Sequence, residues 1–148
     1  MMSLAGRRLL AAACIAGWSV AGACSGDGTT STVLDEVAPT KADIAREAAI
    51  AFPDSTADFR LVRVGPGQID VSFTIETTDI AAFASGSGIE LRSGERTLTH
   101  ASPLWDVAVS GDVSGGSSER GGVDRSAEVV VDADRATVRL TIEPEAGS

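Results

Sequence analysis

The sequence predicts an α+β fold, in which an antiparallel β-sheet of about four to six strands carries two helices packed on one face. Apolar and polar residues alternate over residues 69–75, and again over 127–131 and 138–142, as in antiparallel strands with one buried face. Two short segments, residues 40–52 and 78–85, have apolar residues at helical spacing. The order α, β, β, α, irregular, β, β therefore favours helices on one side of an antiparallel sheet.

The first predicted helix begins after Thr40 and ends before Pro53. Thr40 is a residue type that caps helix N-termini, and Asp43, three residues later, suits the first turn. Pro53 cannot continue a helix. Because its apolar stripe is narrow and mostly alanine, we expect this helix to lie close against the sheet. The stripe consists of Ile44, Ala45, Ala48, Ala49 and Phe52.

A β-hairpin is predicted to follow the first helix. Residues 59–64 have the composition of a strand, and Gly65-Pro66-Gly67 has the chemistry of a turn. Residues 69–75 form the second strand, whose polar side chains are expected to face water. The apolar side chains of that strand are Ile69, Val71, Phe73 and Ile75, and they alternate with Asp70, Ser72, Thr74 and Glu76.

The second predicted helix is short. Thr78 can cap its N-terminus, and Gly86 can end it. Ile80, Phe83 and Ala84 share one side of this helix, which we expect to face the sheet.

The second half of the domain has a poorly patterned segment followed by a clear hairpin. Segments 89–92 and 105–109 could form short edge strands. Residues 110–122 are rich in Gly and Ser, a composition that predicts a mobile surface loop. The final hairpin has strands at 127–131 and 138–142, with Asp132-Ala133-Asp134-Arg135 as its turn and Pro144 as its end. Its residues expected to face outward are Arg139, Thr141 and Glu143.

The N-terminal residues 1–23 have the composition of a signal peptide. Arg7 and Arg8 precede fifteen mostly apolar residues, 9–23, that end in small side chains. This run is shorter than the about 20 apolar residues that a membrane-spanning helix needs. The segment Ala21-Gly22-Ala23-Cys24 resembles the lipobox of bacterial lipoproteins. The resemblance implies that Cys24 carries a diacylglyceryl group and becomes the first residue after cleavage.

The cysteine count favours lipidation over an ordinary secreted protein. The chain has two cysteines, Cys14 and Cys24. Cys14 lies inside the signal, with too few apolar residues before it for a cleavage site of its own. The cleaved chain would then hold one thiol and no internal disulfide. We therefore expect a protein held by lipid on the outer face of the cytoplasmic membrane.

The cleaved chain is predicted to consist of a flexible tether, residues 24–39, and a single α+β domain, residues 40–148. The tether is mostly small and polar. Removing residues 1–23 takes away two arginines and no acids, so the formal charge changes from -9 to -11. A domain this acidic is not expected to bind nucleic acid or an anionic membrane surface through charge.

Several segments together resemble those of small lipoproteins of Streptomyces and related actinobacteria. They are Cys24, Pro53-Asp54-Ser55-Thr56-Ala57-Asp58-Phe59-Arg60, the strand at 69–75, Thr78-Asp79-Ile80-Ala81-Ala82-Phe83 and Trp105. The likeness covers residues from about 50 to 142. It implies a location at the membrane and implies no particular activity.

The sequence shows no motif for a cofactor, a metal ion or a catalytic nucleophile. Gly-x-Ser-x-Gly and Ser-x-x-Lys are absent, and no glycine-rich phosphate loop is followed by lysine. His100 is the only histidine and lies in a Thr/Ser-rich segment, where we expect a solvent-exposed side chain. Asp132 and Asp134 have the spacing of a turn rather than of a metal site. A non-enzymatic domain without metal or cofactor is therefore predicted.

Trp105 is the one candidate for contact with a ligand or partner. It is the only tryptophan in residues 24–148. If exposed, it could anchor a partner, and if buried, it fills the core. The resulting hypothesis is a membrane-anchored interaction domain for an unidentified protein or small molecule. The alternatives are a ligand-binding sensor or accessory subunit of an envelope system, and a hydrolase that uses dispersed carboxylates.

Overall fold

The computed structural model describes residues 38–145. The predicted signal peptide, residues 1–23, and the predicted lipidation site Cys24 lie outside the described residues, as does most of the predicted tether, residues 24–39. The statements that follow concern the described part of the chain.

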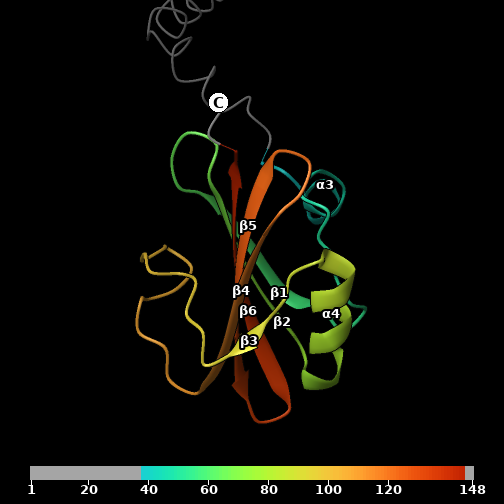
Figure 1. Cartoon of the computed structure of the whole chain (residues 1–148), viewed down its shortest axis with the longest axis vertical. Helices are drawn as coiled ribbons and strands as arrows, with labels where there is room; N and C mark the ends of the chain where they lie inside the picture. The colour runs from blue at the N-terminus through green and yellow to red at the C-terminus, as the bar shows by residue number, and fades with distance from the viewer. Residues whose placement is uncertain (1–37, 146–148) are drawn as a thin grey trace, which may run out of the picture. The chain divides into compact units, whose positions relative to one another are not determined.

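Six strands form one antiparallel sheet accompanied by two helices, which confirms the predicted α+β fold (Figure 1). The strand order is β1-β2-β6-β5-β4-β3. Both predicted hairpins are present, and β6 joins them by pairing with β2 as well as with β5. The first hairpin and the end of the domain therefore meet at the centre of the sheet. The strands are β1 (Ala57–Arg63), β2 (Ile69–Glu76), β3 (Arg92–Ser93), β4 (Asp112–Glu119), β5 (Val123–Asp132) and β6 (Arg135–Pro144).

Helices α3 (Lys41–Glu47) and α4 (Ile80–Ser87) lie on the same face of the sheet, called here the inner face (Figure 1). Ile44 of α3 and Phe83 of α4 pack into a core with the apolar side chains of the strands. The ring centroids of Phe73 and Phe83 lie 5.7 Å apart in an edge-to-face contact. The buried strand residues of this core are Val71, Phe73, Ile75, Ala127, Val129, Ala136, Val138, Leu140 and Ile142.

Helix α3 begins as predicted but ends earlier. The amide of Asp43 donates to Thr40 Oγ1 at 3.2 Å, and the amide of Thr40 donates to Asp43 Oδ2 at 2.9 Å, which forms a capping box. The amide of Thr40, then its hydroxyl and the guanidinium of Arg46, hold the pKa of Asp43 below its usual value. The predicted continuation to Phe52 is wrong, because Ala49 takes a left-handed φ of 50° that a helix cannot include.

Helix α4 carries Phe83 toward the sheet, as predicted, but its ends differ from those expected. Thr78 does not cap it and lies instead in a short 3-10 turn, Thr77–Asp79. The helix ends at Ser87, and its C-cap is Gly88, which has a left-handed φ of 67°. Gly86 remains inside the helix, where a Cβ atom would lie 2.6 Å from the Cβ of Ala51. The glycine therefore allows close packing rather than ending the helix.

Arg125 is a buried cation on the inner face that sequence patterning did not predict. Its side chain is 1% exposed, and its guanidinium donates to the carbonyl oxygens of Ala48 at 3.1 Å and Ser87 at 2.8 Å. These carbonyls lie at the C-terminal ends of α3 and α4, where the helix dipole favours a positive charge. Burial, and to a lesser degree the nearby Arg120, lower the pKa of Arg125. Arg125 thus joins both helices to the sheet.

The prediction of a mobile loop at 110–122 is wrong. Most of this Gly/Ser segment forms strand β4. β4 pairs with β5 along its whole length, from Asp112 to Glu119. A Cβ atom on Gly116 would lie 2.0 Å from the carbonyl oxygen of Glu90. A Cβ on Gly115 would lie 2.6 Å from the carbonyl oxygen of Glu95. The glycines therefore mark a close crossing of the backbone and not flexibility.

The edge strands expected at 89–92 and 105–109 are largely absent. The first is reduced to β3, which pairs Arg92 and Ser93 with β4. In the second, no strand forms among the described residues, and Trp105 instead makes an isolated antiparallel bridge with Ser102. The Asp132-Ala133-Asp134-Arg135 turn is confirmed between β5 and β6.

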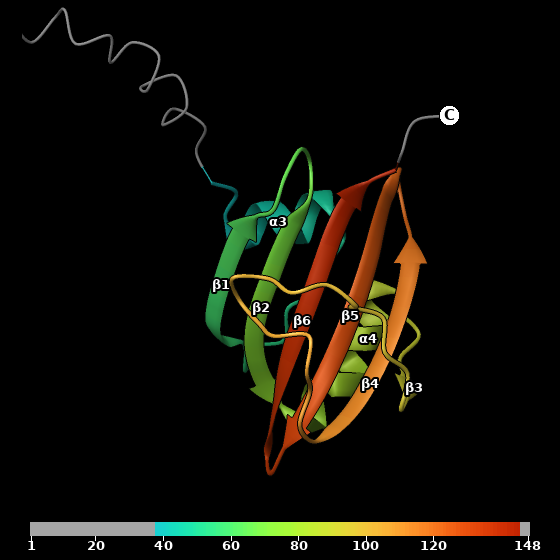
Figure 2. The ribbon, with the colours of Figure 1, turned by 90° about the vertical axis from the view of Figure 1, so that its left-hand side faces the viewer.

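The polar face of the sheet is covered, although its side chains were expected to meet water. Residues 94–110, called here the strap, leave β3, cross this outer face and return to β4 (Figure 2). Beneath the strap Asp70 and Glu128 are 0% exposed, and Thr141 is 5% exposed. Thr141 does point outward from β6 as predicted, but the strap removes it from solvent.

Candidate functional site

Glu128 of β5 binds the first part of the strap. One of its carboxylate oxygens, Oε1, accepts hydrogen bonds from Arg96 Nε at 2.8 Å, the Thr97 amide at 2.9 Å and the Leu98 amide at 3.0 Å. The hydroxyl of Thr97 also donates to the carbonyl oxygen of Ala127 at 2.8 Å. A buried carboxylate needs several such donors, because it has lost the hydrogen bonds of water. Glu128 therefore fixes residues 96–98, called here the strap root.

The far part of the strap contacts the sheet through His100. Its Nε2 lies 3.2 Å from Oδ2 of Asp70, on β2. The other oxygen of Asp70 accepts from the hydroxyl of Thr141 at 2.8 Å and from Nε2 of Gln68 at 3.2 Å. The prediction of a solvent-exposed His100 holds in part, since its side chain is 36% exposed, but its ring also contacts a fully buried carboxylate. Residues 99–106 are called here the strap tip.

Trp105 is buried within the strap tip. It is 7% exposed, and its indole Nε1 donates to the carbonyl oxygen of His100 at 3.3 Å. The ring centroids of the two residues lie 5.9 Å apart. This placement agrees with Trp105 as a core residue and leaves its ring little surface for a partner. Trp105 instead supports the position of His100.

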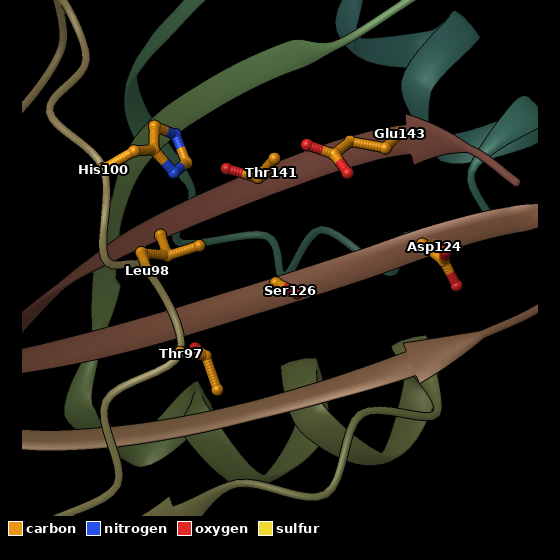
Figure 3. Close-up of a pocket in the computed structure, with 7 residues that line it drawn as sticks. All are labelled: Thr97, Leu98, His100, Asp124, Ser126, Thr141 and Glu143. Atoms are coloured by element: carbon orange, nitrogen blue, oxygen red, sulfur yellow. The ribbon is translucent and has the colours of Figure 1, made fainter. Parts of the chain in front are cut away.

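A cavity of about 200 Å³ opens between the strap and one end of the sheet (Figure 3). Thr141 and Glu143 of β6 lie beside Ser126 and Asp124 of β5, and His100 faces them from the strap (Figure 3). The lining residues are Thr97, Leu98, His100, Asp124, Ser126, Thr141 and Glu143. A second hollow shares Asp124, Ser126 and Glu143 and extends to Ser117 and Glu119 of β4. Together the two hollows are called here the outer groove.

Three carboxylates line up across the outer groove. Glu143 on β6 is paired directly with Asp124 on β5, which is paired with Glu119 on β4. All three are exposed, and within residues 38–145 none has a hydrogen-bond or ion-pair partner. Like charges directly opposite each other destabilise a sheet. Arg125 also lines the second hollow, but its guanidinium is bound to the carbonyl oxygens of Ala48 and Ser87, so the three carboxylates are the exposed charged groups that border the groove there.

The described residues do not assemble a catalytic triad or a metal centre. The hydrogen-bond contacts of the His100 ring within residues 38–145 are with Asp70 and Gln68, and they include no hydroxyl nucleophile. In the same residues, no group of three or more His, Cys, Asp or Glu side chains is placed to hold a metal ion. The helices of this part of the chain are also too short or too polar to cross a membrane.

Sequence patterning missed the residues that organise this site. The burial of Asp70 and Glu128 could not be predicted, because the sequence of the strap that covers them has no regular hydrophobic period. Glu128 offered one signal, since it is an acid inside the predicted strand 127–131, between Ala127 and Val129. Comparison of the chain with protein-family models, curated proteins and solved structures finds no match. The resemblance to small actinobacterial lipoproteins therefore stays a prediction.

Proposed function

We propose that this protein is a non-enzymatic lipoprotein, anchored through Cys24 to the outer face of the cytoplasmic membrane, whose domain binds a positively charged protein partner in the outer groove. The observation that carries the binding proposal is the pair Asp124 and Glu143, two unpartnered carboxylates in one cavity with Ser126, Thr141 and His100. A lysine or arginine side chain would neutralise the carboxylates, and the hydroxyl groups would accept its remaining hydrogen bonds.

The size of the cavity under the strap, which is one of the two hollows of the outer groove, suits a single side chain. The cavity under the strap is about 200 Å³, which is smaller than the roughly 300–1,000 Å³ of pockets that enclose drug-sized molecules. A single basic side chain fits such a volume. A small amine would fit as well. The alternative function, a ligand-binding sensor or accessory subunit, therefore remains a second candidate, and its ligand would bind in the outer groove and not at Trp105.

The paired carboxylates also bear on the hydrolase alternative. Two carboxylates in one cavity are the minimum that a glycosidase requires. Its general acid, however, needs an environment that keeps it protonated, such as a desolvated pocket. Asp124 and Glu143 are both exposed. This exposure favours binding over acid catalysis.

The binding proposal is tested by crosslinking in membranes that carry the full-length protein. A photoreactive residue replaces Ser126 in the groove, and a control replaces Asp134 in the β5–β6 turn, at the opposite end of these strands. We expect a discrete partner at position 126 that is lost in Asp124→Asn/Glu143→Gln and kept in Asp132→Asn. The yield of the crosslink should fall between about 0.1 M and 1 M salt, because screening by salt shortens the range of the electrostatic attraction. Equal capture at both positions, or capture that survives loss of both carboxylates, would contradict the proposal.

The anchor has its own test. Mass spectrometry of the mature N-terminus should show an acylated Cys24, and Cys24→Ser should move the protein from the membrane to the soluble fraction. An unmodified N-terminus at another residue would overturn the lipoprotein proposal and leave the binding proposal standing.

A further inference from the structure

The strap is attached strongly at its root and weakly at its tip. At the root, Glu128 accepts three hydrogen bonds, including a charge-assisted one from Arg96 at 2.8 Å. At the tip, the ring of His100 lies 3.2 Å from the carboxylate of Asp70 and 3.4 Å from Nε2 of Gln68. Arg139 of β6 adds one bond to the tip, to the carbonyl oxygen of Asp106 at 3.2 Å. The tip can therefore separate from the sheet while the root stays bound.

The charged groups that face His100 are acidic. Asp70 of β2 contacts its ring, while Glu143 of β6 and Asp124 of β5 line the same cavity. Of the nearby cations, Arg96 is bound to Glu128 and to the carbonyl oxygen of Val107. Arg139 of β6 donates to the strap backbone at Asp106. Both of these cations are therefore bound to other groups, and the charged side chains that line the cavity with His100 are acidic.

We propose that the contact between His100 and Asp70 is a pH-dependent latch that holds the strap tip on the sheet when the imidazole is protonated and releases it when the imidazole is neutral. Histidine changes charge between about pH 5 and pH 8. Hydrogen bonds between two charged groups are roughly twice as strong as neutral ones, so loss of the proton weakens the latch without removing every contact. The latch is closed at the lower pH and loosened as the pH rises.

Release of the latch would widen the outer groove, because His100 forms its strap-side wall (Figure 3). This last step rests on the proposed binding function, whereas the latch itself does not. An extracytoplasmic domain meets changes of external pH directly. Binding of a basic side chain would then be regulated by the same imidazole that borders the groove.

Trp105 reports on the latch, because its ring lies beside His100 within the strap tip. The mature lipidated protein, which begins at Cys24 and therefore has Trp105 as its only tryptophan, is titrated in detergent with acrylamide at about pH 5 and pH 8. We expect quenching of Trp105 to increase about fivefold at the higher pH. This factor corresponds to the difference in strength between a charge-assisted and a neutral hydrogen bond, which sets how often the strap tip separates from the sheet. Amide exchange, corrected for its intrinsic pH dependence, should accelerate in residues 99–106 and not in 96–98.

Two variants separate the latch from general effects of pH. His100→Gln keeps a neutral hydrogen-bonding group on a half-exposed strap residue, so it should fold and show high quenching at both pH values. Asp106→Asn removes an exposed acid beside Trp105 and should keep the response of the wild type. Equal quenching of the wild type at both pH values, or a pH response that survives in His100→Gln, would overturn the latch. Neither result bears on crosslinking at position 126, which tests the binding proposal alone.

Discussion

The inner and outer faces of the sheet are built from the same strands and are covered in different ways. The inner face buries apolar side chains under α3 and α4, with aromatic contacts such as Phe52–Phe73 at 5.1 Å between ring centroids. The outer face buries polar side chains under the strap (Figure 2). Apolar burial is spread over many contacts and has no preferred direction. The outer cover depends on a few directional bonds, so single residues can loosen it locally.

Arg125 on the inner face and Glu128 on the outer face are both buried charged residues, and they are stabilised differently. Arg125 on the inner face is bound by carbonyl oxygens and the hydroxyl of Ser118, at 2.7 Å, without a carboxylate. Glu128 on the outer face binds a guanidinium and two amides. Arg125 links the helices that form the core, whereas Glu128 links an irregular segment. Loss of the first is expected to affect the whole domain, and loss of the second mainly the strap.

The largest expected effect is on the inner face. Phe73→Ala should lower the free energy of unfolding by about 3–5 kcal/mol, because it removes a fully buried ring that touches Phe52 and Phe83. Ser72→Ala, the adjacent residue on the outer face of β2, is the matched control and should change it by less than about 0.5 kcal/mol. Urea unfolding followed by circular dichroism measures both. Equal losses in the two variants would remove the distinction between the faces.

A smaller effect is expected at the strap root. Glu128→Ala leaves Arg96 and the amides of Thr97 and Leu98 without their acceptor, at a cost of about 1–3 kcal/mol. Amide exchange should accelerate in residues 96–98 more than in β2 or β6. Glu128→Gln, which keeps a carbonyl acceptor, should restore part of the protection. If Glu119→Ala, a change to an exposed acid of β4, accelerates the same amides equally, the assigned role of Glu128 is wrong.

The smallest effect concerns the helix that begins the inner cover. The pKa of Asp43 is lowered in the folded state by the amide and hydroxyl of Thr40 and by Arg46. Its carboxylate therefore adds stability above its unfolded pKa, and this stability is lost as the pH falls through the folded value. Asp43→Asn should flatten the acid limb of a stability–pH profile below about pH 4. The exposed Asp54→Asn should leave that limb unchanged, and an identical change in both would contradict the capping role.

Much of the fold could be predicted from local pattern, and the site could not. Alternation in β2, β5 and β6 identified both hairpins, and Thr40 with Asp43 identified the start of α3. The same alternation gave no information about what covers the polar face. The early end of α3, at Glu47, and the strand β4 were not predicted either, because both are accompanied by contacts with distant segments. Arg125 binds the carbonyl oxygen of Ala48 after α3, and Gly116 of β4 lies against the backbone of Glu90.

By itself, the sequence determined which residues alternate, where α3 begins and which face of each strand is apolar, because these properties follow from neighbours a few residues apart. The tertiary structure alone decided that Asp70 and Glu128 are buried, that His100 meets a carboxylate and that three acids align across β6, β5 and β4. The contacts between the strap and these buried acids join residues 30 or more positions apart in the chain. Their partners are set by strand order and register, which no local period encodes.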